Sequence, residues 1–316
     1  MEPDGMAVFA GSGSPQLTAR ICSYLKIPQG ANETLHFSDG NTFVRILENV
    51  RGRRVYLVQQ TVFPANDNFV ELLFWIDAFK RAGTDSVTVI IPYFSYAKGD
   101  KKDEPRVSIR ARVCADAIEA SGANRVVTMD LHAPQIQGFF HIPVDNLYAL
   151  PVLCRRIKDM DLDDIVIVSP DVGFAKQARR YASCLGVSMA IADKERLAHD
   201  EKAHILNIIG DVKDKTAVVV DDFTISGGTL ADVSHQLMER GAKAVYAVVT
   251  HGVLTGSAIE RIDKSPIKKL IITDTVEHQP VQFSDKIEVV SVAPLFAEAI
   301  KRIHNRESIS AMFEHV

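Results

Sequence analysis

Two adjacent carboxylates, Asp221 and Asp222, stand between an apolar run at residues 217–220 and a Gly-Gly pair at residues 227–228. The apolar run predicts a buried parallel strand, and the apolar spacing from Leu230 to Leu237 predicts one face of a helix. A strand therefore leads into a helix through a short loop. Because ligands of open α/β sheets bind at such strand ends, this loop is a candidate binding site.

The residue types of this loop suit a phosphorylated sugar. Gly227 and Gly228 carry no side chains, so successive backbone N–H groups can close on an anion at the positive end of the helix. Ser226 and Thr229 add hydroxyl donors. The acidic pair would repel a phosphate, but it suits sugar hydroxyls or a hydrated divalent cation. The sequence thus predicts a sugar-phosphate site at residues 221–229.

Two better-known phosphate loops do not match this segment. It lacks the Gly-Lys-Ser/Thr ending of a Walker loop, and its glycines are adjacent rather than spaced as in a dinucleotide fingerprint. Gly-Gly-Thr alone is typical of an ordinary capped turn. The preceding strand and the acidic pair are what favour a binding site.

Further polar residues follow other strand-like runs. Asp130 and His132 come just past one run, where an imidazole can ligate a cation or position a phosphate oxygen, and Asp171 ends another. Lys194 and Arg196 fall on the same side of an extended segment and can clamp the oxygens of one polyphosphate. Any one of these features alone is more often structural or a solvated surface group.

The bulk composition bounds the function. With 316 residues the chain suits two domains of ordinary size, and 47% hydrophobic and 24% charged residues are typical of a soluble globular protein. A net charge of −4 argues against a nucleic-acid partner, and we expect no membrane partner because no apolar run is long enough to span a bilayer. The start of the chain has no signal-like segment, so a cytoplasmic location is expected. The cysteines are expected to be reduced core or helix residues.

Strand-like and helix-like patterns alternate along the chain. The strand-like runs begin at Val55, Val87, Arg125, Ile165, Ala217, Ala244 and Lys269. This alternation predicts an α/β fold with parallel sheets flanked by helices on both faces. A weak repeat relates the strand–loop–helix–strand segment from Val55 to the one from Ala217, which predicts two halves of similar fold. The proline-bracketed segment 141–153 is the candidate boundary.

Taken together, a series of motifs resembles the ribose-phosphate diphosphokinase (phosphoribosyl pyrophosphate synthetase) family over nearly the whole chain. The series is FAGSGSPQL, HFSDGN, ENVRG, PANDNFVELL, PYFSYAKGDKKD, DLHAPQIQGFF, PVDNLY, SPDVG, DKER, DDFTISGGT, THGV and ESISAMFEHV. The resemblance implies two phosphoribosyltransferase-like domains, each a mainly parallel sheet flanked by helices. The expected domains are 6–148, with the tail 304–316 packing back on it, and 149–303, which carries the ribose 5-phosphate loop.

The resemblance also implies a reaction and roles for particular residues. The family transfers the diphosphoryl group of ATP to the carbon-1 hydroxyl of ribose 5-phosphate, giving phosphoribosyl diphosphate (PRPP) and AMP, with Mg²⁺ as cofactor. The implied ribose 5-phosphate site is Asp221, Asp222, Ser226, Gly227, Gly228 and Thr229. The implied ATP site is Phe37, Asp39, Asn41, Lys98, Gly99, Asp103 and His132. His132 and Asp171 are the implied metal ligands, and Lys194 and Arg196 the implied catalytic residues.

Regulation and assembly are further implications of the resemblance. Residues that match the family's allosteric region are Gln137, Asp145, Asn146, Ser308 and Ser310. A homo-oligomer is expected, made of dimers that form a hexamer and share the adenine pocket between neighbouring subunits.

Several positions depart from the family pattern. They are Asn41 where Glu is common, Lys98 for Arg, Gly99 for Gln or Ser, Pro134 for Ser or Glu, Ile225 for Asp or Ser, and Ser226 for Thr. These departures leave one alternative open, a catalytically weak homologue that assembles with an active synthetase and regulates it. A phosphoribosyltransferase that consumes PRPP is a further alternative, which leaves the first half and the DKER segment without a role.

Overall fold

The computed structural model describes residues 5–195, 204–278 and 283–313. By its internal contacts the chain divides into two compact units. Unit 1 contains residues 1–148, 275–277 and 291–315, and unit 2 contains residues 149–274 and 278–290. Residues 291–303, which the sequence analysis places in the second domain, thus cluster with unit 1, because helix α8 (Ala293–Asn305) packs on α1 (Pro15–Leu25).

The sheet of unit 1 has five strands in the order β1-β4-β5-β6-β7, and all of its pairs are parallel. Its strands are β1 (Met6–Ala10), β4 (Arg54–Val58), β5 (Ser86–Ile91), β6 (Arg125–Met129) and β7 (Val144–Leu147). The residues of β1, β4, β5 and β6 are almost all buried, since helices cover both faces of a parallel sheet, whereas edge strand β7 is partly exposed.

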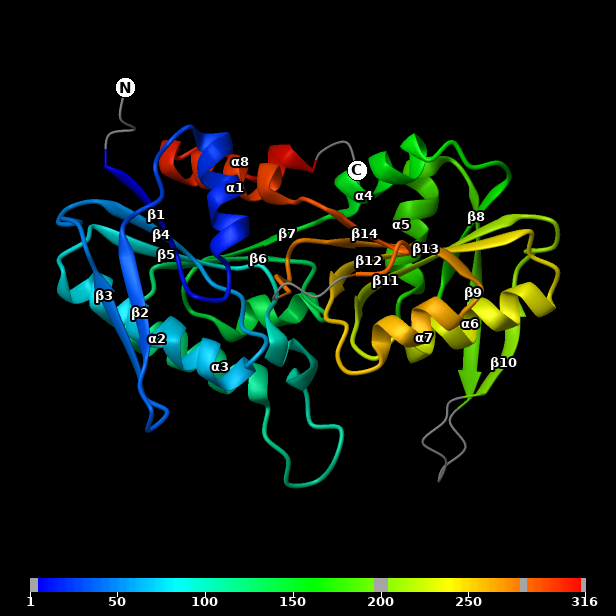
Figure 1. Ribbon diagram of the computed structural model, residues 1–316, viewed down its shortest axis with the longest axis horizontal. Coiled ribbons are helices and arrows are strands. Elements are labelled where there is room, and N and C mark those ends of the chain that lie inside the picture. Colours follow the sequence, from blue (N-terminus) through cyan, green and yellow to red (C-terminus); the bar gives the residue numbers. More distant parts are fainter. Residues whose placement is uncertain (1–4, 196–203, 279–282, 314–316) are drawn as a thin grey trace. The chain divides into compact units, whose positions relative to one another are not determined.

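Helices α2 (Ala65–Arg81) and α3 (Arg110–Ser121) cover one face of this sheet, and α1 and α8 lie side by side on the other (Figure 1). The core between α2, α3 and the sheet includes Trp75 and Phe79, whose rings stack with centroids 5.7 Å apart. Short 3₁₀ helices complete the unit at Ser95–Gly99, Pro134–Phe139 and Ser310–Met312.

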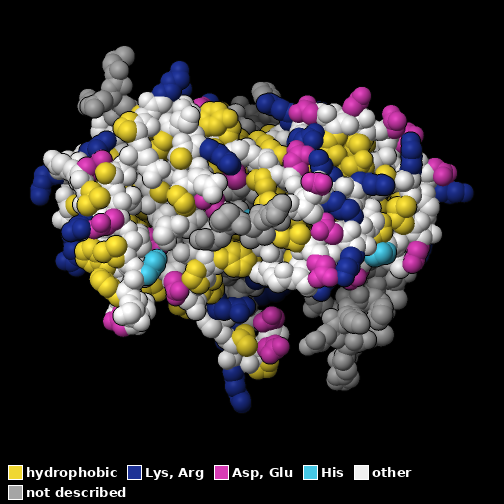
Figure 2. Space-filling model, viewed as in Figure 1, with side chains coloured by type: hydrophobic (Ala, Val, Ile, Leu, Met, Phe, Trp, Pro, Cys, Tyr) yellow, Lys and Arg dark blue, Asp and Glu magenta, His cyan; other side chains and the backbone are white. Residues whose placement is uncertain are grey.

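An antiparallel hairpin, β2 (Asn32–His36) and β3 (Thr42–Ile46), lies outside the main sheet of unit 1. Its β3 strand packs on α2, while Leu35, Phe37 and Phe43 leave large apolar surfaces exposed. Figure 2 shows hydrophobic side chains gathered over this part of the molecule. The hairpin therefore presents apolar side chains to the outside.

The sheet of unit 2 has seven strands in the order β10-β9-β8-β11-β12-β13-β14. The strands are β8 (Ile165–Ser169), β9 (Ser188–Glu195), β10 (His204–Ile209), β11 (Thr216–Thr224), β12 (Ala244–Gly252), β13 (Ile267–Thr273) and β14 (Ile287–Val290). Only the β9–β10 pair is antiparallel. The helices are α4 (Leu150–Asp159), α5 (Ala175–Leu185), α6 (Gly228–Glu239) and α7 (Ala258–Lys264).

The seven predicted strand runs all form strands, and the predicted α/β class with parallel sheets is confirmed. The two segments of the weak repeat both form a strand, a helix and a second strand parallel to the first, namely β4-α2-β5 and β11-α6-β12. The cysteines are free, three of them buried, and burial raises the pKa of Cys22 and Cys114 to about 11. Within the described residues, no helix is both long and apolar enough to cross a membrane.

Candidate active site

The candidate site in unit 2 lies where the order of the parallel strands changes direction. From β8 the chain continues to β9 on one side, whereas β11, on the other side of β8, continues outward to β12 and β13. Such a switch point leaves a crevice at the carboxyl ends of the two central strands. Asp171 follows the end of β8. The acidic pair lies near the carboxyl end of β11, beyond the residues that pair with β8.

The carboxylates at this crevice influence one another. The backbone N–H of Asp222 donates to Asp221 Oδ1 at 3.0 Å, and Asp222 itself is only 9% exposed. Burial raises the pKa of the Asp221 carboxyl well above its usual range, and the charges of Asp222 and Asp171 raise it further. The site therefore concentrates negative charge, which favours a cation or hydroxyl donors as ligands.

Asp171 is held at the beginning of α5. Its Oδ1 accepts a hydrogen bond of 3.0 Å from the backbone N–H of Phe174, and its carbonyl accepts one of 2.7 Å from the hydroxyl of Ser169. A Cβ on Gly173 would stand 3.2 Å from Asp171 Oδ1. The small residue after Val172 thus lets the chain turn closely around the carboxylate.

The Gly-Gly loop forms the beginning of α6, as the sequence predicts. Gly227 is the N-cap residue, with φ of 70°, and has no side chain with which to cap the helix; the N–H of Gly228 donates to Ser226 Oγ at a long 3.4 Å. A Cβ at Gly227 would also lie 3.3 Å from the carbonyl oxygen of Ala258 and from Ile262. Backbone conformation and space both require glycine here. Ser226 and Thr229 are exposed beside it, so the helix end can receive an anion.

Lys194 lies in β9, where its backbone pairs with Ile205 of β10. Arg196 lies outside the described residues. Of the two basic residues predicted to be catalytic, the structure thus places Lys194, near the end of β9, the strand adjacent to β8.

Unit 1 carries the predicted residues that follow β5 and β6. His132 is exposed shortly after β6, beyond Asp130, whose φ is 40°. Lys98 and Asp103 are exposed in and after the 3₁₀ helix that follows β5. Gly99 is buried, and a Cβ there would stand 2.6 Å from Arg110 Nε. Close packing against α3 accounts for glycine at this position.

The predicted adenine residues lie at the tip of the β2–β3 hairpin. Phe37 is 52% exposed, with its ring centroid 6.4 Å from that of Phe43. Asn41 donates to the Asp39 carboxylate through its backbone N–H at 3.0 Å and through its side-chain amide at 2.7 Å. The bond from the backbone and then that from the amide lower the pKa of Asp39. Asn41 can make this contact, whereas a glutamate would repel Asp39.

Three of the predicted regulatory residues lie at β7 and the preceding 3₁₀ helix. Arg125 pairs with the Asp145 carboxylate at 2.5 Å, and the backbone N–H of Leu131 donates to Asn146 Oδ1 at 3.1 Å. Gln137 bonds back to the carbonyl of Pro134 at 2.9 Å.

The two predicted regulatory serines lie near the C-terminus. Ser308 accepts a hydrogen bond from Arg302 through its carbonyl, and Ser310 begins the last 3₁₀ helix. Nearby, the ring of Phe313 packs edge-on against Tyr148, with centroids 5.5 Å apart.

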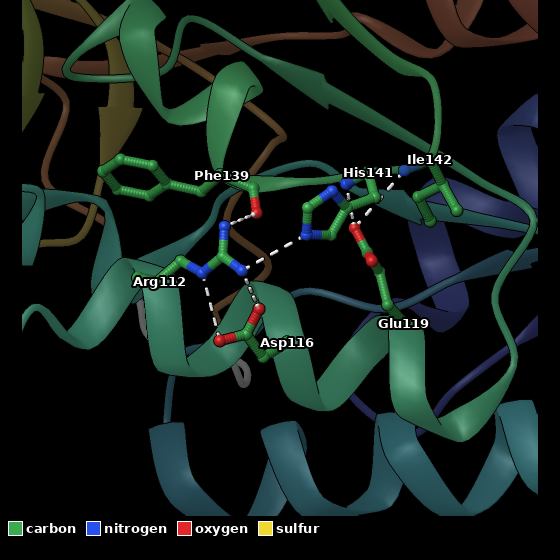
Figure 3. A network of polar contacts seen from close by, with 6 residues as sticks. All are labelled: Arg112, Asp116, Glu119, Phe139, His141 and Ile142. Carbon is green, nitrogen blue, oxygen red and sulfur yellow. Dashed lines mark hydrogen bonds and ion pairs between the residues drawn. The ribbon is translucent and has the colours of Figure 1, made fainter.

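A network that the sequence analysis missed holds the segment after β6 to α3 (Figure 3). Arg112 donates from Nη1 to the carbonyl of Phe139 at 2.7 Å, and its Nη2 pairs with Asp116 and lies 3.4 Å from His141 Nε2. The Glu119 carboxylate accepts the backbone N–H groups of His141 and Ile142. The i, i+4 spacing of Arg112 and Asp116 in the sequence could have predicted their ion pair. Nothing in the sequence indicated the partners of Arg112 outside α3.

The structure thus brings Asp171, the acidic pair and the Gly-Gly loop together in unit 2, while His132, Lys98 and the hairpin residues belong to unit 1. In the parts of the chain that are described, no three His, Cys, Asp or Glu side chains form a ready metal cage.

Comparison with known proteins shows the family of the chain. The chain matches the N-terminal domain of ribose phosphate pyrophosphokinase over residues 6–122 and the phosphoribosyl synthetase-associated domain over residues 194–314. A ribose-phosphate pyrophosphokinase of Caldanaerobacter subterraneus subsp. tengcongensis is 48% identical over 98% of both chains. That of Clostridium tetani is 45% identical over 99% of this chain and 98% of its own.

A solved structure is similar as well. The crystal structure of phosphoribosylpyrophosphate synthetase from Mycobacterium smegmatis superposes with a TM-score of 0.90 at 36% identity, covering 96% of this chain and 100% of that one. Identity of this degree over nearly the whole length does not arise from a shared fold alone. The chain therefore belongs to the ribose-phosphate pyrophosphokinase family.

Proposed function

We propose that this chain is a Mg²⁺-dependent ribose-phosphate diphosphokinase, which transfers the diphosphoryl group of ATP to the carbon-1 hydroxyl of ribose 5-phosphate and releases PRPP and AMP. The observation that carries the proposal is the beginning of α6 at Gly227, which follows the acidic pair of β11 after a short loop. This arrangement places an anion site near carboxylates that can accept hydrogen bonds from sugar hydroxyl groups. Membership of the family supports the same reaction.

Ribose 5-phosphate would bind through both parts of this loop. Its phosphate would accept hydrogen bonds from the backbone of Gly227 and Gly228 and from the hydroxyls of Ser226 and Thr229. Its ribose hydroxyls would donate to Asp221 and Asp222, which lie ahead of the loop in β11. The loop would thereby fix the sugar through its phosphate and its ribose hydroxyls.

ATP would bind through residues of unit 1. Phe37, Asp39 and Asn41 would contact the adenine, with the neighbouring subunit completing the pocket. Lys98, Gly99, Asp103 and His132 would contact the remainder of the nucleotide. Lys194 and Arg196 would stabilise the negative charge on the transferring diphosphoryl group, because such transfers depend mainly on in-line positioning and countercharge.

The residues present fit a magnesium ion. Mg²⁺ is usually bound by one or two carboxylates together with substrate phosphates and water, and Asp171 belongs to the group of carboxylates whose charges raise the pKa of Asp221. We propose Asp171 and His132 as the residues that hold it, His132 also through contact with an ATP phosphate. When bound, the ion would neutralise phosphate charge on ATP.

Assembly, location and regulation complete the proposal. We propose a homo-oligomer of dimers that form a hexamer, a cytoplasmic location, and no nucleic-acid or membrane partner. The exposed apolar side chains of the hairpin support assembly. We propose that the two units correspond to two phosphoribosyltransferase-like domains. Gln137, Asp145, Asn146, Ser308 and Ser310 are proposed allosteric residues.

A second candidate is a catalytically weak homologue that assembles with an active synthetase. The observation that favours it is the contact of Asn41 with Asp39, which occupies a carboxylate of the proposed adenine pocket. The Gly-Gly loop by itself would also fit a phosphoribosyltransferase that consumes PRPP.

One assay separates the candidates. The pure protein is incubated with ATP, Mg²⁺ and ribose 5-phosphate, and AMP and PRPP are measured; we expect equal amounts of both. Consumption of PRPP with a nucleobase and without ATP would favour the phosphoribosyltransferase. Inactivity combined with tight assembly onto an active synthetase would favour the regulator.

A further inference from the structure

Three consecutive carbonyl groups ahead of Gly227 accept hydrogen bonds from a single segment, residues 253–261, which ends in α7. The pairs are Thr224 O with the N–H groups of Val253 (2.9 Å) and Leu254 (3.3 Å), Ile225 O with the N–H of Thr255 (2.8 Å), and Ser226 O with Nη1 of Arg261 (2.8 Å). The first two carbonyls are held by backbone, and the third is held by a side chain. Arg261 therefore supplies to the Ser226 carbonyl the hydrogen bond that backbone N–H groups supply to the two carbonyls before it.

The guanidinium of Arg261 lies directly against the Gly-Gly turn. Its Nη1 atom is 3.3 Å from the place where a Cβ on Gly228 would stand. Its backbone is fixed in α7, where the N–H donates to the Ser257 carbonyl at 2.9 Å. Helices α6 and α7 pack on each other, as Figure 1 shows. The cation is thus presented to the loop from a helix outside the loop.

Holding the Ser226 carbonyl also sets the direction of the next N–H. In a planar trans peptide the C=O of one residue and the N–H of the following residue point in opposite directions. A Ser226 carbonyl turned toward Arg261 therefore turns the Gly227 N–H away from Arg261 and fixes its direction. The positive charge of the guanidinium adds to the potential at this helix end.

We propose that Arg261 is a positioning residue for the phosphate of ribose 5-phosphate, acting through the Ser226–Gly227 peptide. The inference rests on the proposed function of this loop. It means that affinity for ribose 5-phosphate depends on a residue of α7 as well as on the Gly-Gly loop itself. Because Arg261 acts on the ribose 5-phosphate loop and not on the ATP site, its loss changes the affinity for one substrate selectively.

The test compares Arg261→Ala and Arg261→Lys with Lys264→Ala. Lys264 lies on the same helix, is exposed and pairs with Glu260, so its variant removes the same charge without a contact to the loop. For Arg261→Ala we expect KM for ribose 5-phosphate to rise about tenfold, because a charge-assisted hydrogen bond is lost, with kcat and KM for ATP within about twofold. Arg261→Lys should recover part of that loss, and Lys264→Ala should match the wild type.

Several outcomes would overturn the inference. They are an unchanged KM for ribose 5-phosphate in Arg261→Ala, an equal rise in Lys264→Ala, and a rise in both KM values together with a lower melting temperature, which would mark a merely structural role. Titration calorimetry of each variant with ribose 5-phosphate gives a readout that does not require turnover. A wild type that binds the ester but forms no PRPP would refute the proposed function and leave the role of Arg261 decided by these affinities. A wild type that binds no ester would refute both.

Discussion

The backbone N–H of Asp222 lies 3.0 Å from Asp221 Oδ1 and donates a hydrogen bond to it, so the two acids of β11 are joined within the chain. This contact favours the charged form of Asp221, but it is outweighed by burial and by the charges of Asp222 and Asp171. The carboxyl group most central to the proposed sugar site is thus also the one whose ionisation the fold opposes. A carboxyl group whose ionisation is unfavourable in the free protein is expected where a bound ligand supplies a positive charge or a hydrogen-bond donor.

Replacing Asp221 with Asn should stabilise the ligand-free protein at neutral pH. The folded-state pKa of Asp221 is raised above its unfolded value near 3.9, so its contribution to stability is largest at low pH and is lost as pH rises toward the folded pKa. In EDTA we expect Asp221→Asn to melt above the wild type at pH 8 and close to it at pH 4. Thermal unfolding at both values measures this. Asp232→Asn, at an exposed site on α6, is the control. If the difference in melting temperature between Asp221→Asn and the wild type were the same at both pH values, the raised pKa would be contradicted.

Replacing Lys194 with Ala should lower turnover far more than affinity. A cation that neutralises charge developing on the transferred group acts mainly in the transition state, so kcat should fall about 100-fold or more while KM for ribose 5-phosphate stays within about threefold. Steady-state kinetics of PRPP formation measure both constants. Lys213→Ala, an exposed lysine before β11, should leave both unchanged. Equal losses in kcat and affinity would remove Lys194 from the transition state.

Replacing Glu71 with Gln should destabilise unit 1. The Glu71 side chain is fully buried in α2, and it accepts hydrogen bonds from both the N–H and the hydroxyl of Ser12, from Thr34 Oγ1 at 3.0 Å and from Trp75 Nε1 at 2.9 Å. An amide can keep its oxygen toward the three donors at Oε1 and turn its N–H group to the Ser12 hydroxyl, but it loses the negative charge that strengthens all four bonds, at a cost of about 2 kcal/mol. Urea unfolding followed by fluorescence of the single tryptophan measures the change.

The control for Glu71 lies on the same helix. The Asp77 side chain is about half exposed and pairs with Arg81, so Asp77→Asn should change stability by less than about 0.5 kcal/mol. If Asp77→Asn and Glu71→Gln were equally stable, the four donors around Glu71 would be contributing nothing.

Replacing Glu288 with Gln should remove a pH-dependent part of the stability of unit 2. Glu288 accepts two hydrogen bonds from Arg156, at 2.5 and 3.0 Å, and pairs with Lys269; chiefly the Arg156 contact lowers its pKa. A lowered carboxyl pKa gives stability that is present above the unfolded value near 4.3 and is lost as pH falls through the folded value. Since the side chains of Arg156 and Glu288 are about a quarter exposed and that of Lys269 is 36% exposed, we expect Glu288→Gln to lower the free energy of unfolding at pH 7 by about 1 kcal/mol.

The melting temperature as a function of pH tests this ion pair. The difference between the wild type and Glu288→Gln should be clear at pH 7 and should shrink toward pH 3. Glu260→Gln, which removes one carboxylate from an exposed pair with Lys264, is the matched control and should give a smaller difference. A constant difference across the pH range would show that Glu288 contributes through packing rather than through its charge.

The sequence by itself determined the local elements of this protein. Periodicity of apolar residues marks β11 and α6, and Gly227 stands where the backbone adopts a positive φ that other residues resist. These features depend on neighbours within a few residues along the chain, so they can be read in order. The acidic pair and the Gly-Gly loop were predictable for this reason, as was the α/β class.

Only the tertiary structure decided which distant residues meet. The adjacency of β8 and β11 brings Asp171 toward Asp221, and α7 brings Arg261 to Ser226, 35 positions away along the chain. The pairing of α8 with α1 places residues 291–303 in unit 1. None of these contacts leaves a local pattern, because strand order and helix packing are set by the burial of whole faces against one another.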